Sequence, residues 1–166
     1  MADHASSLVI RPARAEDCPA IVELMWGLAQ FEKLTHIFHA TPELLHEHLF
    51  GRRPYAEVLL AEWEGKPAGF ALFFHNYSTF LCRPGLYLED VYVVPELRSK
   101  GIGKAIMVKL AQIAVERGCG RFEWTVLDWN TKAMDLYKRL GAVAMDEWKI
   151  FRMSGEALKN FAEGKV

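Results

Sequence analysis

The sequence is short of several features that mark special classes of protein. Its 166 residues include only three cysteines, Cys18, Cys82 and Cys119, an odd number at wide spacing. That count argues against a disulfide framework and favours a reducing compartment. No apolar run approaches the roughly 20 residues of a membrane-spanning helix. Residues 1–7 lack the basic start and apolar core of a secretory signal. We therefore expect a cytoplasmic chain with no membrane partner.

An excess of charge is also missing. The 20 Lys and Arg residues nearly balance the 21 Asp and Glu residues, which gives a net charge of −1. A chain without a strong overall field does not attract nucleic acid, so we expect none as a partner and any anion site must be local. The sequence contains no internal repeat and no linker. Its length suits one domain, which we expect to span residues 1–166.

Hydrophobic periodicity and turn signals alternate along the chain. Asp17 and Thr41 are predicted to cap the first two helices, and residues 64–67 to turn a hairpin. The predicted strands are 8–11, 57–63, 68–74, 86–94, 122–127, 142–146 and 148–153, and a long loop is expected at 76–85. Further helices are predicted at 102–117, at 131–140 before Gly141, and after Ser154. This order predicts an α/β fold with a mixed, mostly antiparallel central sheet flanked by helices.

The segment 86–104 carries the strongest signal. An alternating apolar run ends at Pro95, a polar loop holds Arg98, Gly101 and Gly103, and an amphipathic stretch follows. This order predicts a strand, a glycine turn and a helix N-terminus. The backbone N–H groups of such a turn and the positive end of the helix dipole favour a phosphate or pyrophosphate.

Two known phosphate loops do not fit the turn. A nucleoside triphosphate loop needs Gly where Arg98 stands and a hydroxyl residue where Ala105 stands. A dinucleotide loop needs a third Gly where Ile106 stands. A turn without any ligand is the remaining alternative. The cationic Arg98 and Lys100 favour an anion site over that alternative.

Two motifs together resemble a known family. The first is Arg98-x-x-Gly101-x-Gly103 after a Val-Val-Pro strand end, and the second runs from Asn130 to Ala142. Both resemble the GNAT N-acetyltransferase superfamily. The strand 86–93, the Phe-Glu-Lys segment at 31–33 and the Glu-Trp pair at 147–148 are similar to its diamine (spermidine/spermine) branch, which includes thialysine-acetylating relatives. The resemblance runs from about residue 8 to residue 153.

The resemblance implies a function and a set of cofactor contacts. It implies direct transfer, in a ternary complex, of an acetyl group from acetyl-CoA to a primary amine of a small diamine, polyamine or lysine analogue. It also implies a homodimer, which the run 148–153 could serve. The implied cofactor contacts are Val91, Tyr92, Val93, Arg98, Ser99, Lys100, Gly101, Ile102, Gly103, Lys104, Asn130 and Tyr137.

The resemblance also implies individual roles. A backbone N–H near Val91 would bind the thioester carbonyl, and Tyr137 would protonate the departing sulfur. Asn130 is also typical of a helix N-cap. Glu89 would be the general base, directly or through a water. Strand alternation predicts that Glu89 lies on one face with Tyr87 and Val91.

Asp90 is predicted on the opposite face of that strand, with Leu88 and Tyr92, and to anchor the substrate. A cationic amine needs carboxylates with apolar or aromatic surface between them. The candidate substrate residues are Glu32, Phe80, Glu89, Asp90, Glu147 and Trp148. A solvated charged surface over core aromatics would give the same sequence, and the carboxylate pair could simply hold a nearby Arg.

Several alternatives stay open on sequence alone. A covalent route through Cys82 lacks a base that sequence spacing places beside it, because His75 is near only in sequence. The four histidines between residues 36 and 48 (His36, His39, His46 and His48) do not have the spacing of a metal site, and we expect no metal. A peptide N-acetyltransferase and a non-catalytic acyl-CoA-binding module would carry the same loop.

Overall fold

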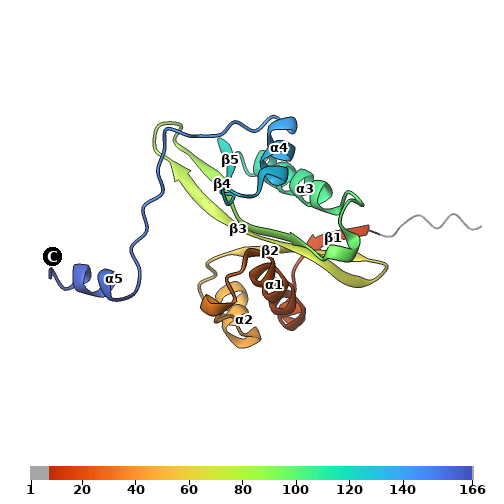
Figure 1. Cartoon of the computed structure of the whole chain (residues 1–166), viewed down its shortest axis with the longest axis horizontal. Helices are drawn as coiled ribbons and strands as arrows, with labels where there is room; N and C mark the ends of the chain where they lie inside the picture. The colour runs from red at the N-terminus through yellow and green to blue at the C-terminus, as the bar shows by residue number, and fades with distance from the viewer. Residues whose placement is uncertain (1–7, 166) are drawn as a thin grey trace, which may run out of the picture. The chain divides into compact units, whose positions relative to one another are not determined.

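The computed structural model describes residues 8–165 (Figure 1). This part of the chain divides after Thr125 into two compact units. The first unit holds a five-stranded sheet and three α-helices. The second holds helices α4 (Thr131–Arg139) and α5 (Gly155–Ala162). The single-domain organisation predicted above remains a prediction.

The sheet of the first unit follows the order β1-β2-β3-β4-β5. Its strands are β1 (Leu8–Pro12), β2 (Glu57–Trp63), β3 (Lys66–Ser78), β4 (Arg83–Val93) and β5 (Arg121–Trp124). The first three pairings are antiparallel, and β5 joins β4 in parallel after a helical crossover. The predicted mixed, mostly antiparallel α/β fold is confirmed.

Helices cover both faces of this sheet. Helices α1 (Cys18–Glu32) and α2 (Pro42–Phe50) lie on one face and α3 (Ile102–Glu116) on the other, as Figure 1 shows. The core under α1 and α2 contains Cys18, Ile21, Leu24, Leu28, Leu45, Leu49, Val58, Leu60, Phe70 and Tyr92. On the α3 side, Ile102, Ile106 and Leu110 are almost completely buried. No helix among residues 8–165 is long and apolar enough to cross a membrane.

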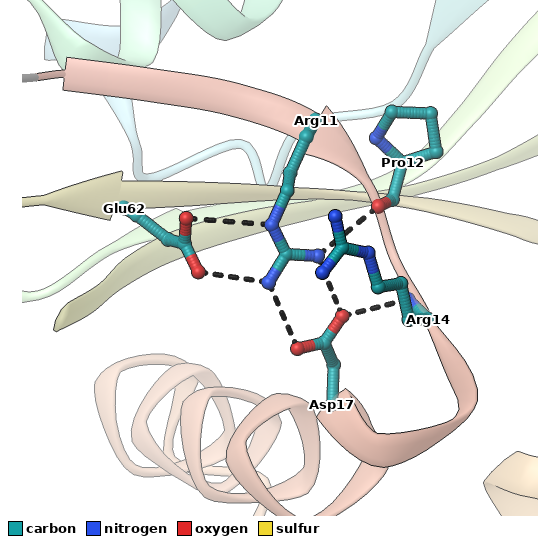
Figure 2. Close-up of polar contacts among 5 residues, drawn as sticks. All are labelled: Arg11, Pro12, Arg14, Asp17 and Glu62. Atoms are coloured by element: carbon teal, nitrogen blue, oxygen red, sulfur yellow. Dashed lines mark hydrogen bonds and ion pairs between the residues drawn. The ribbon is translucent and has the colours of Figure 1, made fainter. Parts of the chain in front are cut away.

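The start of α1 is bound to the sheet through Arg11 (Figure 2). The Arg11 guanidinium donates to Asp17 at 2.7 Å and to Glu62 at 2.8 Å. Asp17 directly precedes α1 as predicted, but its carboxylate does not cap that helix. It accepts instead from Arg11 and from the Arg14 backbone N–H. A charged donor forms the stronger hydrogen bond, so the ion pair displaces the expected cap.

The same network changes the acidity of its members. Hydrogen bonds from Arg11 lower the pKa of Asp17, against the opposing effect of burial. Both carboxylates raise the pKa of Arg11 in turn. The predicted cap of α2 does form, because Thr41 Oγ1 accepts from the Leu44 N–H at 3.2 Å. One cap prediction is therefore confirmed and the other is corrected.

The loop predicted at residues 76–85 is wrong. Strand β3 continues to Ser78 and β4 begins at Arg83, so only residues 79–82 connect them. The strands pair Asn76 with Gly85 and Tyr77 with Pro84. Pro is tolerated near the start of a strand. A Cβ on Gly85 would lie 2.1 Å from the Asn76 side-chain oxygen, so Gly here serves close packing rather than a turn.

The strands predicted at 142–146 and 148–153 are also wrong, and β5 ends at Trp124 rather than at residue 127. Within the described chain, residues 142–153 form no strand, and Val143, Trp148, Ile150 and Phe151 are exposed. Alternation of apolar residues is not sufficient, because a strand also needs a hydrogen-bonding partner. The helices predicted on either side of this segment are confirmed as α4 and α5.

Candidate functional site

The glycine turn lies between β4 and α3. Ser99 and Gly101 adopt positive φ angles of 65° and 83°. The N–H groups of the first turn of α3 have no partner inside the helix. A Cβ on Gly101 would meet nothing within 4 Å, and one on Gly103 would meet only Val93 Cγ2 at 3.9 Å. An anion can therefore approach these N–H groups closely, and the turn fits a pyrophosphate.

The two cations predicted in the turn lie against aromatic rings. The Arg98 guanidinium carbon is 4.7 Å from the Phe31 ring centroid and 5.5 Å from that of Tyr92. Arg98 Nε also donates to the Val93 carbonyl at 3.0 Å. Lys100 Nζ is 5.2 Å from the Trp63 ring centroid. The loop is thus attached to α1, β2 and β4 through its own side chains.

Strand β4 has an unpaired edge next to the turn. Strand β5 pairs only with residues 85–88 of β4, and no described strand pairs with residues 89–93 on that side. The Val94 N–H donates to Ala68 of β3 at 2.9 Å. Because antiparallel strands alternate their hydrogen bonds, the N–H groups of Val91 and Val93 point away from β3. Both point toward the edge that β5 leaves open.

A β-bulge lies in β4 at Glu89. Leu72 pairs with Asp90 and Phe73 with Leu88, so Glu89 has no opposite residue. The prediction that Asp90 shares a face with Leu88 is therefore wrong. The extra residue breaks the two-residue period, which leaves Leu88 on the α3 face and Asp90 on the α1 face. Glu89 itself is exposed.

Three of the predicted substrate carboxylates come together at the end of α1, and we call them the acidic cluster: Glu32, Glu89 and Asp90. Burial, with Glu89 and Glu32 adding to it, raises the pKa of Asp90 to about 6. Burial also raises the pKa of Glu32. Among the described residues, none of the three forms an ion pair with a Lys or Arg. The alternative that the pair simply holds a nearby Arg therefore lacks support.

The remaining first-unit candidates lie outside this cluster. Phe80 is 98% exposed in the β3–β4 connection. Cys82 Sγ is 3.3 Å from Tyr77 Oη, whereas His75 Nε2 is 3.5 Å from an Arg117 nitrogen. A covalent route through a Cys82–His75 pair gains no support from these contacts. No group of three potential metal ligands occurs in the described part of the chain.

The second unit holds the other predicted residues. Asn130 caps α4, because its side-chain oxygen accepts from the Ala133 N–H at 3.3 Å. Burial raises the pKa of the Tyr137 phenol above its ordinary value. Glu147 and Trp148 are exposed in the segment without strands. Gly141 has a φ of 91°, as expected for the residue that follows a helix.

Sequence reasoning missed two features of this region. The bulge at Glu89 has no recognisable sequence signature, although it separates the faces of Asp90 and Leu88. The role of Gly27 in α1 was also missed. A Cβ there would lie 2.6 Å from Tyr92 Oη, so this glycine allows the Tyr92 ring to pack tightly against α1.

Comparisons with known proteins agree with this arrangement. A family model described as the acetyltransferase (GNAT) family matches residues 19–142. The chain is 41% identical to a thialysine N-epsilon-acetyltransferase of Sus scrofa, over 95% of this chain and 98% of that protein. It is 33% identical to an L-ornithine N5-acetyltransferase of Arabidopsis thaliana, over 90% and 86% of the two chains. A solved integron cassette protein of V. cholerae aligns with a TM-score of 0.81 at 26% identity, over 95% and 98% of the chains.

Proposed function

Because the chain belongs to the GNAT family of acetyltransferases, we propose that it transfers an acetyl group directly from acetyl-CoA to a primary amine of a small diamine, polyamine or lysine analogue, in a ternary complex. One observation carries this proposal. Two members of the acidic cluster, Glu89 and Asp90, lie on the strand that leads into the glycine turn, and no Lys or Arg among residues 8–165 forms an ion pair with them. A cationic amine would supply the missing charge beside the cofactor turn.

The proposed cofactor contacts are the turn and the open edge of β4. Bound acetyl-CoA would supply the acetyl thioester. The turn, Arg98 to Lys104, offers backbone N–H groups and cations to the pyrophosphate, and the open space at Gly101 supports this assignment. The edge from Val91 to Val93 offers N–H groups along the strand. Asn130 is included through its place in the family motif and also acts as a helix cap.

The acidic cluster divides two tasks in this proposal. Glu89 takes a proton from the substrate ammonium, directly or through a water, so that the neutral amine can attack, and its exposed position in the bulge supports that role. Asp90 and Glu32 hold the remaining positive charge of the substrate. The names of the relatives, thialysine and L-ornithine acetyltransferases, favour a short amino acid or diamine. Phe80, Glu147 and Trp148 are proposed as outer contacts of the same substrate.

Two further groups complete the proposed chemistry. The Val91 N–H would donate to the carbonyl oxygen as negative charge develops there. Tyr137 would give the departing sulfur the proton that it needs. The family motif, in which Tyr137 stands four residues before Gly141, supports that role.

We also propose a cytoplasmic homodimer. The three cysteines are free, which suits a reducing compartment. The sequence pattern of the exposed apolar run from Trp148 to Met153 predicts a strand. A second copy of the chain could supply the hydrogen-bonding partner strand that this segment lacks within residues 8–165. Light scattering should give twice the mass of one chain. A monomer at micromolar concentration would overturn the dimer alone.

Release of coenzyme A thiol tests the proposed function. Purified protein with acetyl-CoA should release thiol with short diamines, thialysine and L-ornithine, and more slowly with lysine peptides of equal concentration. Faster release with the peptides would favour a peptide acetyltransferase. Tight cofactor binding with no release on any amine would leave only a binding module.

A further inference from the structure

The Arg98 guanidinium connects the two halves of the proposed site. Arg98 is the first residue of the glycine turn, and its guanidinium lies over the rings of Phe31 and Tyr92. Its Nε–H donates a hydrogen bond to the Val93 carbonyl oxygen at 3.0 Å. Among the described residues, its two terminal nitrogens have no recorded hydrogen bond. The contacts therefore fix the plane of the group while its terminal donors stay available.

Both rings belong to segments that carry the acidic cluster. Phe31 precedes Glu32 at the end of α1, and Tyr92 follows Asp90 on β4 by two residues. The Tyr92 ring is 8% exposed and belongs to the core, with its hydroxyl close to Gly27 of α1. Phe31 is 41% exposed, and its ring lies under the Arg98 guanidinium. A shift of Phe31 would thus move Glu32 as well as the support of Arg98.

We propose that Phe31 is a positioning residue that holds Arg98 toward the cofactor and couples the cofactor turn to the acidic cluster. This rests on the proposed function. An arginine side chain has many rotamers, and ordering it on binding weakens affinity. A guanidinium that is stacked on a ring and fixed at Nε is ordered beforehand. By linkage, whatever an amine does to the affinity for coenzyme A, coenzyme A does to the affinity for the amine.

Calorimetry with coenzyme A and the full chain tests this proposal, since no acetyl group is present and no turnover occurs. Phe31→Leu should weaken coenzyme A binding by about 5- to 10-fold, as expected for loss of a cation–π contact. Phe31→Tyr, which keeps the ring, should restore it. Phe50→Leu is the matched control, because Phe50 is similarly exposed, at 39%, and lies at the end of α2. This variant should bind coenzyme A as tightly as the wild type does.

Two further measurements separate positioning from simple destabilisation. Diaminopentane should tighten coenzyme A binding in the wild type and do so less in Phe31→Leu. Arg98→Lys keeps the charge but loses the planar group, so it should weaken coenzyme A binding about as much as Phe31→Leu does. In the double variant, Phe31→Leu should cause no further loss of affinity. Unchanged binding in Phe31→Leu, or fully additive losses, would overturn the proposal. A wild type that binds no coenzyme A would overturn the proposed function as well.

Discussion

The two ends of α1 carry two different clusters of charge. At its start, Arg11 bridges Asp17 and Glu62, and its hydrogen bonds lower the pKa of Asp17. At its end, Glu32, Glu89 and Asp90 form no ion pair with any Lys or Arg of residues 8–165, and burial raises the pKa of Asp90 to about 6.

The first cluster satisfies its own charges and stabilises the fold. The second leaves its charges unsatisfied, which costs stability. Groups of this kind are kept where a ligand uses them. The difference supports our proposal that the end of α1 binds substrate, whereas its start stabilises the fold.

The largest effect is expected from Glu89→Gln. If the proton of the amine is taken by Glu89, kcat/KM should fall by about 10²- to 10⁴-fold. The acidic limb of its pH profile should shift or disappear. Because Glu89 is exposed, Tm should barely change. Steady-state kinetics across pH check this, with Glu47→Gln on the exposed face of α2 as the control. Equal kcat/KM values in the two variants would show that Glu89 is a solvated surface residue without a catalytic role.

Arg11→Met should break the other cluster. It leaves two partly buried carboxylates without their cation, so the free energy of unfolding should fall by about 3 kcal/mol. Urea titration measures this. Arg14→Met is the matched control, because the contact from Arg14 to Asp17 is made by its backbone N–H. The folded Arg11→Met protein should keep its kcat/KM. Equal stability of the two variants would remove the distinction between the clusters.

Asp90→Asn should have the opposite effect on stability. A carboxyl group with a folded-state pKa raised from 3.8 to about 6 destabilises the fold when it is charged, so the wild type loses stability as pH rises across that window. Removing the charge should stabilise the protein by about 1 to 3 kcal/mol at neutral pH. The KM for the amine should rise at the same time. A less stable variant at neutral pH would contradict the account of this cluster.

Asp17→Asn should have the smallest effect: it should lower the free energy of unfolding at neutral pH by about 1 to 2 kcal/mol. The lowered pKa of Asp17 means that its carboxylate stabilises the fold above its usual pKa of 3.8. That contribution is lost as pH falls through the folded-state value. The unfolding curves of variant and wild type should therefore converge at acid pH and separate at neutral pH. Curves that stay parallel across the range would show that ionisation of Asp17 is irrelevant.

Local signals in the sequence predicted much of this fold. The Thr41 cap, the hairpin at residues 64–67 and the start of α3 after Gly101 all depend on neighbouring residues, and the structure confirms each. Predictions failed where side-chain contacts and strand pairing outside the helix and turn patterns decide. The Asp17 carboxylate binds Arg11 instead of capping α1, and Gly85 pairs with Asn76 in a strand where a loop was expected.

The candidate site divides in the same way. The glycine turn could be read from its residues alone. The bulge at Glu89 could not, because it depends on how β3 and β4 pair, and it reversed the face expected for Leu88 relative to Asp90. The contact of Arg98 with Phe31 joins residues that are 67 positions apart in the sequence (98 − 31), and no local pattern encodes it.

The central claim is that the acidic cluster holds a second positive charge of the substrate. The most direct test compares thiol release with diaminopentane and with aminopentane, which differ in one ammonium group, in wild type and in Asp90→Asn. We predict that the wild type prefers the diamine by about tenfold or more in kcat/KM, as loss of one charge-assisted contact requires. We predict that this preference largely disappears in Asp90→Asn. An equal preference for the diamine in both proteins, or none in the wild type, would contradict the claim.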